Sequence, residues 1–421
     1  MELKLGYKRT EVGVIPVEWG CTTVRDVASR ARNAIVGGPF GSNLVSRDYV
    51  EVGVPVIRGQ NMSGKWVSGN FAFVSIAKAR SLEANLARPG DIVFTQRGTL
   101  GQVTIVPEAP FQSYLVSQSQ MKLSVNRAIA DPLFLFYVFT SEEQQEVIRG
   151  GTIQTGVPHI NLGILRDIQV QLPPLPEQHA IAKALSDVDA LIGALDQLVV
   201  KKRDLKQAAM QQLLTGQTRL PSFHGEWEVK RLNGLAEIRS GGTPSTTEPS
   251  YWDGEVPWCT PTDITALKGH KYLCATSRAI TQRGLKASSA EMIPPNSIVM
   301  TSRATIGECA INTVPISTNQ GFKNFVPFAT TDTNFLYYLL ATQKQGFISL
   351  CGGSTFLEIG KAQLVAYQVR LPGSKLEQAA IAEVLSDMDA ELAALERRRD
   401  KTRALKQGMM QELLTGRTRL V

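Results

Sequence analysis

The sequence predicts an α+β chain in which two α/β globular domains are separated by two long antiparallel coiled-coil helices, with a pseudo-twofold internal repeat. A segment of 44 residues occurs twice, 200 positions apart. Apolar side chains in both copies recur at alternating spacings of four and three, which is typical of a coiled-coil seam. The remaining regions mix short β-type runs with turn-rich segments. With 421 residues, 43% of them hydrophobic, the chain is long enough for more than one core.

The repeated segment establishes a duplication. Residues 177–220 and 377–420 align without a gap and share 26 of 44 residues, and both copies end in LLTGxTRL. Shared helical composition alone would not give that identity. The chain therefore consists of two related halves.

Each copy is predicted to be one helix of about 38 residues, or roughly 57 Å. Pro176 near the first turn and a capping-box pattern formed by Ser374 and Glu377 indicate the starts, and Gly216 and Gly416 indicate left-handed ends. A helix this long needs partners, first the other copy and then, through a second apolar face, another subunit. The residues assigned to the helix pair and to this partner interface are Ile181, Leu185, Val188, Ile192, Leu195, Leu213, Leu214, Ile381, Leu385, Met388, Leu392, Leu395, Leu413 and Leu414.

The globular regions contain β-type runs at 54–59, 91–96, 167–174, 297–302 and 366–372. One helix is expected at 131–150 and one at 332–350. The predicted domains are 1–174, 175–220 (helical), 221–373 and 374–421 (helical). The weaker likeness between the globular regions, such as IVFTQRGTLG at 92–101 and IVMTSRATIG at 298–307, suggests that they recognise different things.

Composition narrows the class of protein. The net charge is +7, and because the helical copies contribute +1 and 0, the remaining +6 lies in the globular regions, which favours an anionic partner. The five cysteines are scattered without a CxxC pair, which argues against a disulfide framework or a zinc ribbon. No signal-peptide stretch and no apolar run of 18 residues occurs, so we expect a cytoplasmic protein without a membrane segment.

Catalytic motifs are missing from the sequence. There is no HExxH, GxSxG or [DN]PP[FYW], and the four histidines are isolated. GQNMSGKW at 59–66 matches GxxxxGK but has Trp66 where a P-loop needs a magnesium-binding hydroxyl. GGPFGS at 37–42 is better explained as a turn. We expect no catalytic centre and no metal or cofactor bound by this chain.

Nucleic-acid recognition explains the remaining polar loops better than catalysis does. Base edges and phosphates are contacted by Arg, Lys, Asn, Gln, Ser and Thr, although each such residue is also common in ordinary turns. Residues shared by both halves, such as Arg97 and Arg303, should serve scaffold or phosphate contacts, whereas unshared ones should specify sequence. The candidate DNA-binding residues are Arg58, Gln60, Asn61, Lys65, Arg97, Thr99, Gln118, Thr152, Gln154, Thr155, His159, Thr260, Thr262, Asp263, Lys268, Arg303, Thr305, Asn319, Ser354 and Thr355.

The motifs together resemble those of a known family. Two variable regions, each followed by a copy of a long helix ending LLTGxTRL and preceded by LPPLPEQHAIA or LPGSKLEQAAIA, resemble the DNA-specificity subunit of type I restriction-modification systems. YKRTEVGVIPVEWG at 7–20 and SGGTPST followed by YWDGEVPW are similar to the openings of that family's recognition domains. The likeness covers the whole chain.

The resemblance implies that each target-recognition domain binds one part of a split double-stranded DNA sequence. It also implies that the helices act as a spacer and as the dock for two modification subunits. S-adenosylmethionine, ATP and Mg²⁺ would then belong to the modification and restriction subunits, which would methylate adenine and cleave DNA. Two rivals remain open: a coiled-coil protein scaffold, and a nuclease or methyltransferase with an unrecognised active site.

Overall fold

The computed structural model describes residues 5–11, 13–154, 158–351 and 357–420. The chain forms two compact units, one of residues 1–195 with 398–421 and one of residues 196–397. Each unit therefore holds one globular region and one half of each long helix. The predicted boundaries set the helices apart as regions of their own, whereas the compact units divide them.

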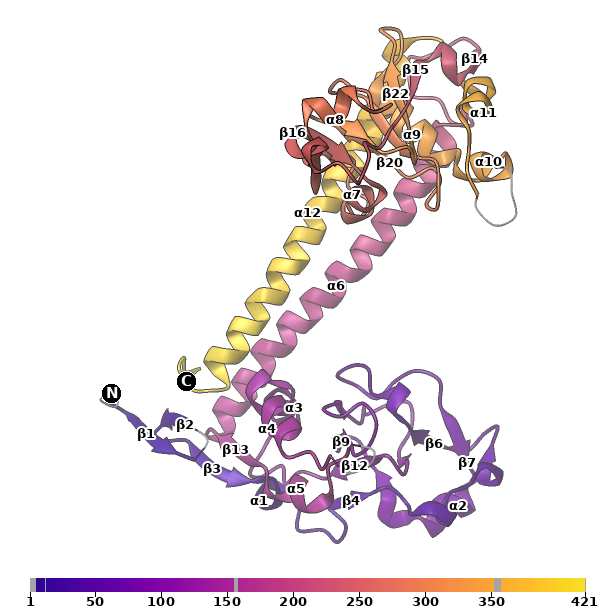
Figure 1. Ribbon diagram of the computed structural model, residues 1–421. Coiled ribbons are helices and arrows are strands. Elements are labelled where there is room, and N and C mark those ends of the chain that lie inside the picture. Colours follow the sequence, from indigo (N-terminus) through magenta and orange to yellow (C-terminus); the bar gives the residue numbers. More distant parts are fainter. Residues whose placement is uncertain (1–4, 12, 155–157, 352–356, 421) are drawn as a thin grey trace. The chain divides into compact units, whose positions relative to one another are not determined.

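The two long helices are the predicted ones. Helix α6 spans Leu175–Leu213 and α12 spans Lys375–Leu413, each of 39 residues. They run antiparallel inside each unit (Figure 1), because Lys202 pairs with Glu391 at 2.6 Å while the later Lys206 pairs with the earlier Asp389. Gly216 and Gly416 have φ of +74° and +71°, the left-handed ends expected from the sequence.

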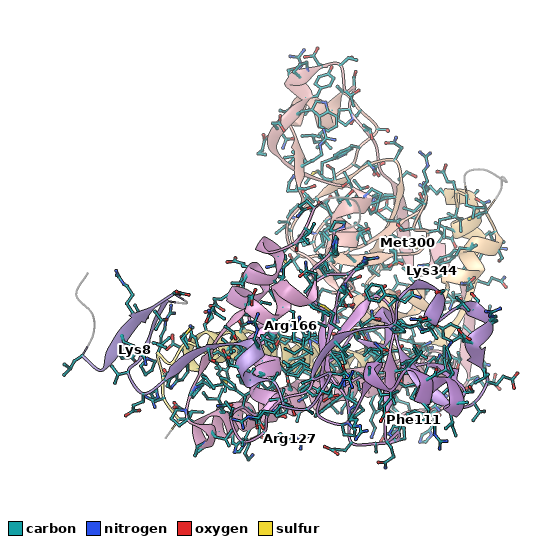
Figure 2. All side chains as sticks on the ribbon, turned by 90° about the horizontal axis from the view of Figure 1, so that it is seen from below. Lys8, Phe111, Arg127, Arg166, Met300 and Lys344 are labelled. Carbon is teal, nitrogen blue, oxygen red and sulfur yellow. The ribbon has the colours of Figure 1, made fainter. Side chains whose placement is uncertain are left out.

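Unit 1 begins with a hairpin of strands β1 (Tyr7–Thr10) and β2 (Gly13–Pro16), followed by β3 (Gly20–Thr23), which pairs antiparallel with β13 (Gln169–Leu172). A four-stranded sheet has the order β10-β9-β12-β4, from Val103–Ile105, Ile92–Thr95, Gln120–Leu123 and Ile35–Gly37. A five-stranded sheet has the order β5-β7-β6-β11-β8, from Tyr49–Val50, Ala72–Val74, Val54–Ile57, Tyr114–Val116 and Leu86–Ala87. Beside the second sheet, Phe111 packs 5.9 Å from Phe71 and 5.6 Å from Tyr114 (Figure 2).

Unit 2 has counterparts of the two larger sheets of unit 1. A five-stranded sheet corresponds to β10-β9-β12-β4, and a three-stranded outer sheet corresponds to the five-stranded sheet of unit 1. Strand β14 (Trp227–Arg231) pairs with β23 (Gln368–Pro372) as β3 pairs with β13. The sheet β15-β22-β19-β20-β17 comprises Ala236–Ser240, Phe322–Pro327, Ile298–Thr301, Cys309–Asn312 and Tyr272–Leu273. The outer sheet β18-β16-β21 comprises Arg278–Ile280, Trp252–Cys259 and Ser317–Thr318.

Most of the shorter helices are also matched between the units, but α1 follows β3 whereas α7 follows β16, so these two do not correspond. Unit 1 has α1 (Val24–Val27), α2 (Ile76–Ser81), α3 (Pro132–Thr140), α4 (Glu142–Gly150) and α5 (Leu162–Asp167). Unit 2 has α7 (Pro261–Ala266), α8 (Gln282–Lys286), α9 (Thr333–Thr342), α10 (Lys344–Ser349) and α11 (Lys361–Ala366). The single helix expected at 131–150 is broken at Ser141, whose hydroxyl accepts from the Gln144 amide at 3.3 Å and so begins a second helix. The helix expected at 332–350 is likewise broken at Gln343.

The core of each unit joins its globular region to both long helices. In unit 1, Trp19, Phe134 and Tyr137 are buried together with Ile181 and Leu185 of α6 and with Leu413 and Leu414 at the end of α12. In unit 2 the matching residues are Trp227, Phe335, Tyr338, Ile381, Leu385, Leu213 and Leu214. The sequence analysis assigned these leucines and isoleucines to the helix pair or a partner. They lie in buried clusters that contain residues of both long helices and of the globular region, where full burial of each contributes about 1.5–3 kcal/mol.

A buried ion pair closes each core. The carboxylate of Glu177, 2% exposed, accepts from Arg419 Nε at 2.6 Å and a terminal guanidinium nitrogen at 2.8 Å, and from Trp19 Nε1 at 3.0 Å. These bonds raise the pKa of Arg419 above its ordinary value. We call this set the Glu177 clamp. It ties the end of α12 to the start of α6.

Unit 2 contains the same arrangement, the Glu377 clamp. Arg219 donates to Glu377 through Nε at 2.7 Å and a terminal nitrogen at 2.8 Å, and Trp227 Nε1 donates at 3.3 Å. The capping box predicted from Ser374 and Glu377 is therefore wrong, because the carboxylate faces Arg219 rather than the backbone of Ser374. The EQ and TRL sequences of the repeat are the two sides of each clamp.

We expect Arg419→Ala to lower the free energy of unfolding by about 3 kcal/mol, because Glu177 would be left as an uncompensated buried charge. Arg417→Ala is the matched control, since Arg417 is exposed and 4.0 Å from Glu412, and an exposed pair contributes at most about 1 kcal/mol. Urea unfolding followed by circular dichroism measures both variants. Equal losses for the two would contradict the role given to the clamp.

Candidate nucleic-acid interface

We call the sheets β10-β9-β12-β4 and β15-β22-β19-β20-β17 the inner sheets. Some of the polar loops predicted to contact DNA lie together at one edge of the inner sheet in each unit. In unit 1 this edge comprises the glycine pair after β4, the turn before β12 and the loop after β9. The fit is tight, since a Cβ on Gly38 would lie 1.8 Å from the carbonyl oxygen of Ser117. In unit 2 a Cβ on Gly241 would lie 1.9 Å from the carbonyl oxygen of Asn319. Only glycine fits at either position, so both halves hold these loops in the same way.

In unit 1 the sheet edge presents Arg97, Gln118 and His159. Arg97 is exposed and forms a β-bridge with His159. The backbone amides of Gln96 and Arg97 donate to the carbonyl of Ser119 at 2.7 and 3.3 Å. Gln118 is exposed, and its Nε2 donates to Gly41 and Leu44 carbonyls at 2.9 and 3.0 Å, so its amide oxygen remains for a ligand.

Arg58 points into a cavity beside this edge. The cavity has a volume of about 430 Å³ and is lined by the loop from Gly41 to Tyr49, by Arg58 and by Ser117, Gln118 and Ser119. Nε of Arg58 is buried and makes no hydrogen bond to any described residue. A guanidinium beside two hydroxyls and an amide suits a phosphate or the acceptor edge of guanine.

The same edge of unit 2 carries different electrostatics. Arg303 is paired with Glu358 at 2.8 Å, and Lys323 lies 3.9 Å from the same carboxylate. Burial lowers the pKa of Lys323, and Glu358 opposes that shift. Thr243 donates to Gln320, which lies next to Asn319. Unit 2 therefore presents two cations beside a carboxylate at this edge, and the two edges differ in charge.

Several other candidates remain accessible. Gln60, Thr99, Gln154, Thr262, Lys268 and Thr305 are exposed, and Asn319 is half-buried. Thr152 is half-buried and its hydroxyl donates to the Ile148 carbonyl at 3.2 Å, which ends α4. Contact of these residues with DNA stays a prediction. Thr155, Ser354 and Thr355 lie outside the described residues.

Four candidates have structural roles that the sequence analysis did not foresee. Asn61 is fully buried and its amide bonds the Ser68 and Asn70 carbonyls at 3.1 and 3.0 Å. Asp263 is 7% exposed and accepts from the Thr260 amide and hydroxyl at 2.7 and 2.8 Å. Burial alone would raise the pKa of Asp263, but the hydrogen bonds from Thr260 and Ser277 outweigh it and lower that pKa. The geometry thus argues against DNA contacts from Asn61, Thr260 and Asp263.

Lys65, the fourth, faces the long helices. Its Nζ lies 3.1 Å from Ser186 Oγ and 3.5 Å from Asp189. Lys271, which the sequence analysis did not select, takes the matching place in unit 2, with Nζ 2.9 Å from Ser386 Oγ. Burial lowers the pKa of Lys271, and Asp389 opposes that shift. Both lysines join a globular region to its helix pair.

Gln96, Ser117, Ser119, Gln320 and Lys323 also lie at the sheet edges, within polar loops that the sequence indicates, but they were not among the candidate residues. A local signal for these edges is the glycine after the first inner strand, because Gly38 and Gly241 occupy matching positions. Gly38 was interpreted only as part of a turn.

Metal-binding clusters and membrane-spanning helices are absent from the described residues. No three His, Cys, Asp or Glu side chains of the described part of the chain are grouped to hold a metal ion. All five cysteines are free. Within the described ranges, no helix combines the length and apolar character that crossing a membrane requires.

We expect Asn61→Ala to lower the free energy of unfolding by about 2 kcal/mol, because it leaves buried backbone groups without partners. The neighbouring Gln60→Ala is the control, since Gln60 is exposed and makes one bond, to the Asn70 carbonyl at 3.1 Å. Urea midpoints of the two variants give the comparison. A loss for Gln60→Ala as large as that for Asn61→Ala would reverse our assignment.

Comparison with known proteins places these features in a family. The family model of the type I restriction modification DNA specificity domain matches residues 40–199 and 224–403. The MjaIX specificity subunit of Methanocaldococcus jannaschii is 37% identical over 166 residues, which cover 39% of this chain and 38% of that protein. The putative MjaX specificity subunit of the same organism is 24% identical over 98% of this chain and 97% of its own length.

A solved structure shows the same fold. The S subunit of a type I restriction-modification system from M. genitalium superposes with a TM-score of 0.56 at 16% identity, covering 98% of both chains. The family model matches both halves of the present chain, one match for each globular region and its helix. The chain belongs to the family of type I restriction modification DNA specificity domains.

Proposed function

We propose that this chain is the DNA-recognition subunit of a type I restriction-modification complex. It binds a two-part DNA sequence, one part through each unit, and directs modification and restriction subunits to that site. The observation that carries the proposal is the pair of matched sheet edges, built on the same glycine frame but presenting different side chains.

The sharing of side chains supports a division of labour. Arg97 and Arg303 follow equivalent strands, β9 and β19, and are both exposed. Residues common to two surfaces that bind different sequences suit phosphate contacts, which do not depend on sequence. Arg58 with its cavity and the Glu358-paired Arg303 differ between the units, so these surroundings suit base selection.

The long helices support the binding of protein partners. Leu198 and Leu205 of α6, seven residues apart, are 38% and 47% exposed in unit 2, and Leu191 and Leu405 are exposed in unit 1. Exposed apolar side chains along a helix indicate contact with another protein. We assign this face to two modification subunits.

Chemistry belongs to the partners under this proposal. The modification subunits would hold S-adenosylmethionine and methylate an adenine flipped out of the duplex, and the restriction subunits would use ATP and Mg²⁺. This chain would supply location and no catalytic group.

Single-molecule sequencing of host DNA tests the proposal. With the chain and its modification subunits expressed together, we expect methylated adenine at one split motif, and we expect that motif to vanish when this chain alone is deleted. Restoring the chain from a plasmid is the control. Methylation that persists without the chain, or a motif without an unread spacer, would refute the proposed function.

A further inference from the structure

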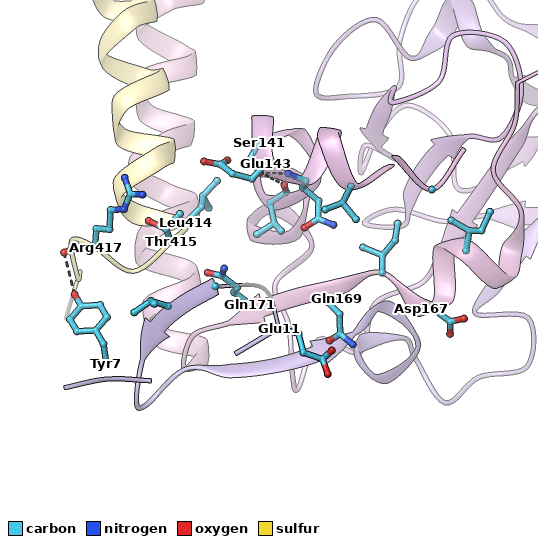
Figure 3. A pocket seen from close by; sticks show the side chains of 18 residues that line it. Tyr7, Glu11, Ser141, Glu143, Asp167, Gln169, Gln171, Leu414, Thr415 and Arg417 are labelled. Atoms are coloured by element: carbon cyan, nitrogen blue, oxygen red, sulfur yellow. Dashed lines mark hydrogen bonds between the residues drawn. The ribbon is translucent and has the colours of Figure 1, made fainter. Parts of the chain in front are cut away.

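A large cavity of unit 1 lies away from the sheet edge. It has a volume of about 1,210 Å³ and lies between the β1–β2 hairpin, α4, the segment from α5 to β13, and the residues that follow α12 (Figure 3). The Tyr7 hydroxyl donates to the Gly416 carbonyl at 2.9 Å and so joins the hairpin to the end of the chain. Small-molecule pockets measure about 300–1,000 Å³, so this cavity suits a larger occupant.

The cavity has an apolar floor and an acidic rim. Its apolar side chains are Val14, Val138, Val147, Ile164, Ile168 and Leu414. Val14 and Val147 are 47% and 54% exposed. The charged side chains are Glu11, Glu143, Asp167 and Arg417, of which Asp167 is paired with Arg25 at 2.8 Å. Among the described residues, neither Glu11 nor Glu143 has a cationic group within ion-pair distance.

A buried donor also faces this cavity without a partner. Gln144 lines the cavity, is 9% exposed, and its Nε2 bonds to no described residue. An unmet buried donor costs about 1–3 kcal/mol, which a carbonyl or carboxylate of a bound chain would offset.

The corresponding face of unit 2 is built differently. Residues 214–226, which link α6 to β14, contain no strand and so provide no hairpin. Helix α11 ends in Ala366 where α5 ends in Asp167, and β23 carries Arg370 where β13 carries Gln171. The acidic rim is therefore a property of unit 1.

We infer that this cavity, called the groove below, binds one basic amphipathic helix of a modification subunit. This inference rests on the proposed function. An apolar stripe would cover the valines and Leu414, and flanking Lys or Arg side chains would face Glu11 and Glu143. DNA is not the occupant, because the carboxylates would repel phosphates. Only the modification subunit at unit 1 gains this contact, so the two copies are held unequally.

The position of the groove favours a modification subunit over other partners. Leu414, Thr415 and Arg417 directly follow α12, and α12 belongs to the helix pair that we assign to those subunits. A subunit docked along the end of α12 reaches the groove without leaving that helix. A partner that bound elsewhere would need a second, separate interface.

Site-specific photocrosslinking in the assembled complex tests the inference. A photoreactive residue replaces Val14 or Val147 in the groove, and Val229 serves as the control. Val229 is 64% exposed on β14, opposite Arg370 in the matching strand pair of unit 2. We expect both groove positions to crosslink to one Lys- or Arg-bearing helical segment of the modification subunit, and Val229 to leave that segment uncrosslinked.

The remaining outcomes each overturn the inference. These are crosslinks to a restriction subunit, to a second copy of this chain or to an acidic segment, and no crosslink at either groove position.

The double variant Glu11→Lys, Glu143→Lys should lower the binding affinity of one of the two modification subunits about tenfold, whereas Arg370→Glu should leave both affinities unchanged. Titration by native mass spectrometry measures this, and equal weakening of both subunits would also count against the groove. If the complex still methylates a split motif but gives no crosslink, only the inference about the groove is contradicted. If methylation of the motif no longer depends on this chain, the proposed function itself is contradicted.

Discussion

The fold depends on a buried carboxylate at the start of each long helix. Glu177 and Glu377 each accept two hydrogen bonds from an arginine that follows the other long helix. Each also accepts one from a tryptophan indole, of Trp19 just before β3 or of Trp227 at the start of β14. A carboxylate this deeply buried is tolerated only when it is paired and hydrogen-bonded. The clamp therefore requires three segments far apart in the sequence to meet at one point. That requirement accounts for the strong identity of the repeated segment, whose EQ and TRL ends supply both sides of each clamp.

The two halves are alike around the clamps and in the inner sheets, and they differ in the outer sheets and at the sheet edges. The inner sheets share the order of four strands, to which unit 2 adds β17, and they share the glycine frame and the arginine after β9 or β19. Lys65 and Lys271 hold each globular region to its helices in the same way. The outer sheets differ in strand number, and the sheet edges differ in charge. A common scaffold with different surfaces is what two readers of different DNA sequences require. The acidic groove adds a second difference, because the β1–β2 hairpin occurs in unit 1 and the link from α6 to β14 replaces it in unit 2.

Sequence patterns predicted the long helices because their period extends over many turns and ends at Gly216 and Gly416. They did not predict the clamps, since Glu177 and Arg419 are 242 positions apart and nothing local distinguishes a buried glutamate from an exposed one. The polar loops show the same limit. Gln60 and Asn61 are adjacent and chemically similar, yet one is exposed and the other is fully buried. Lys65 was assigned to DNA because its loop is polar, but its direction is set by Ser186 and Asp189 of α6, which only the tertiary structure brings near.

The central claim is that each unit contacts its own part of one DNA site. A hydroxyl-radical footprint of the chain with its modification subunits, on DNA containing the methylated motif, tests this most directly. We expect two protected stretches separated by an accessible spacer, with Arg97→Ala weakening protection of one stretch and Arg303→Ala weakening the other. A single continuous protected stretch, or equal weakening of both stretches by either substitution, would contradict that claim.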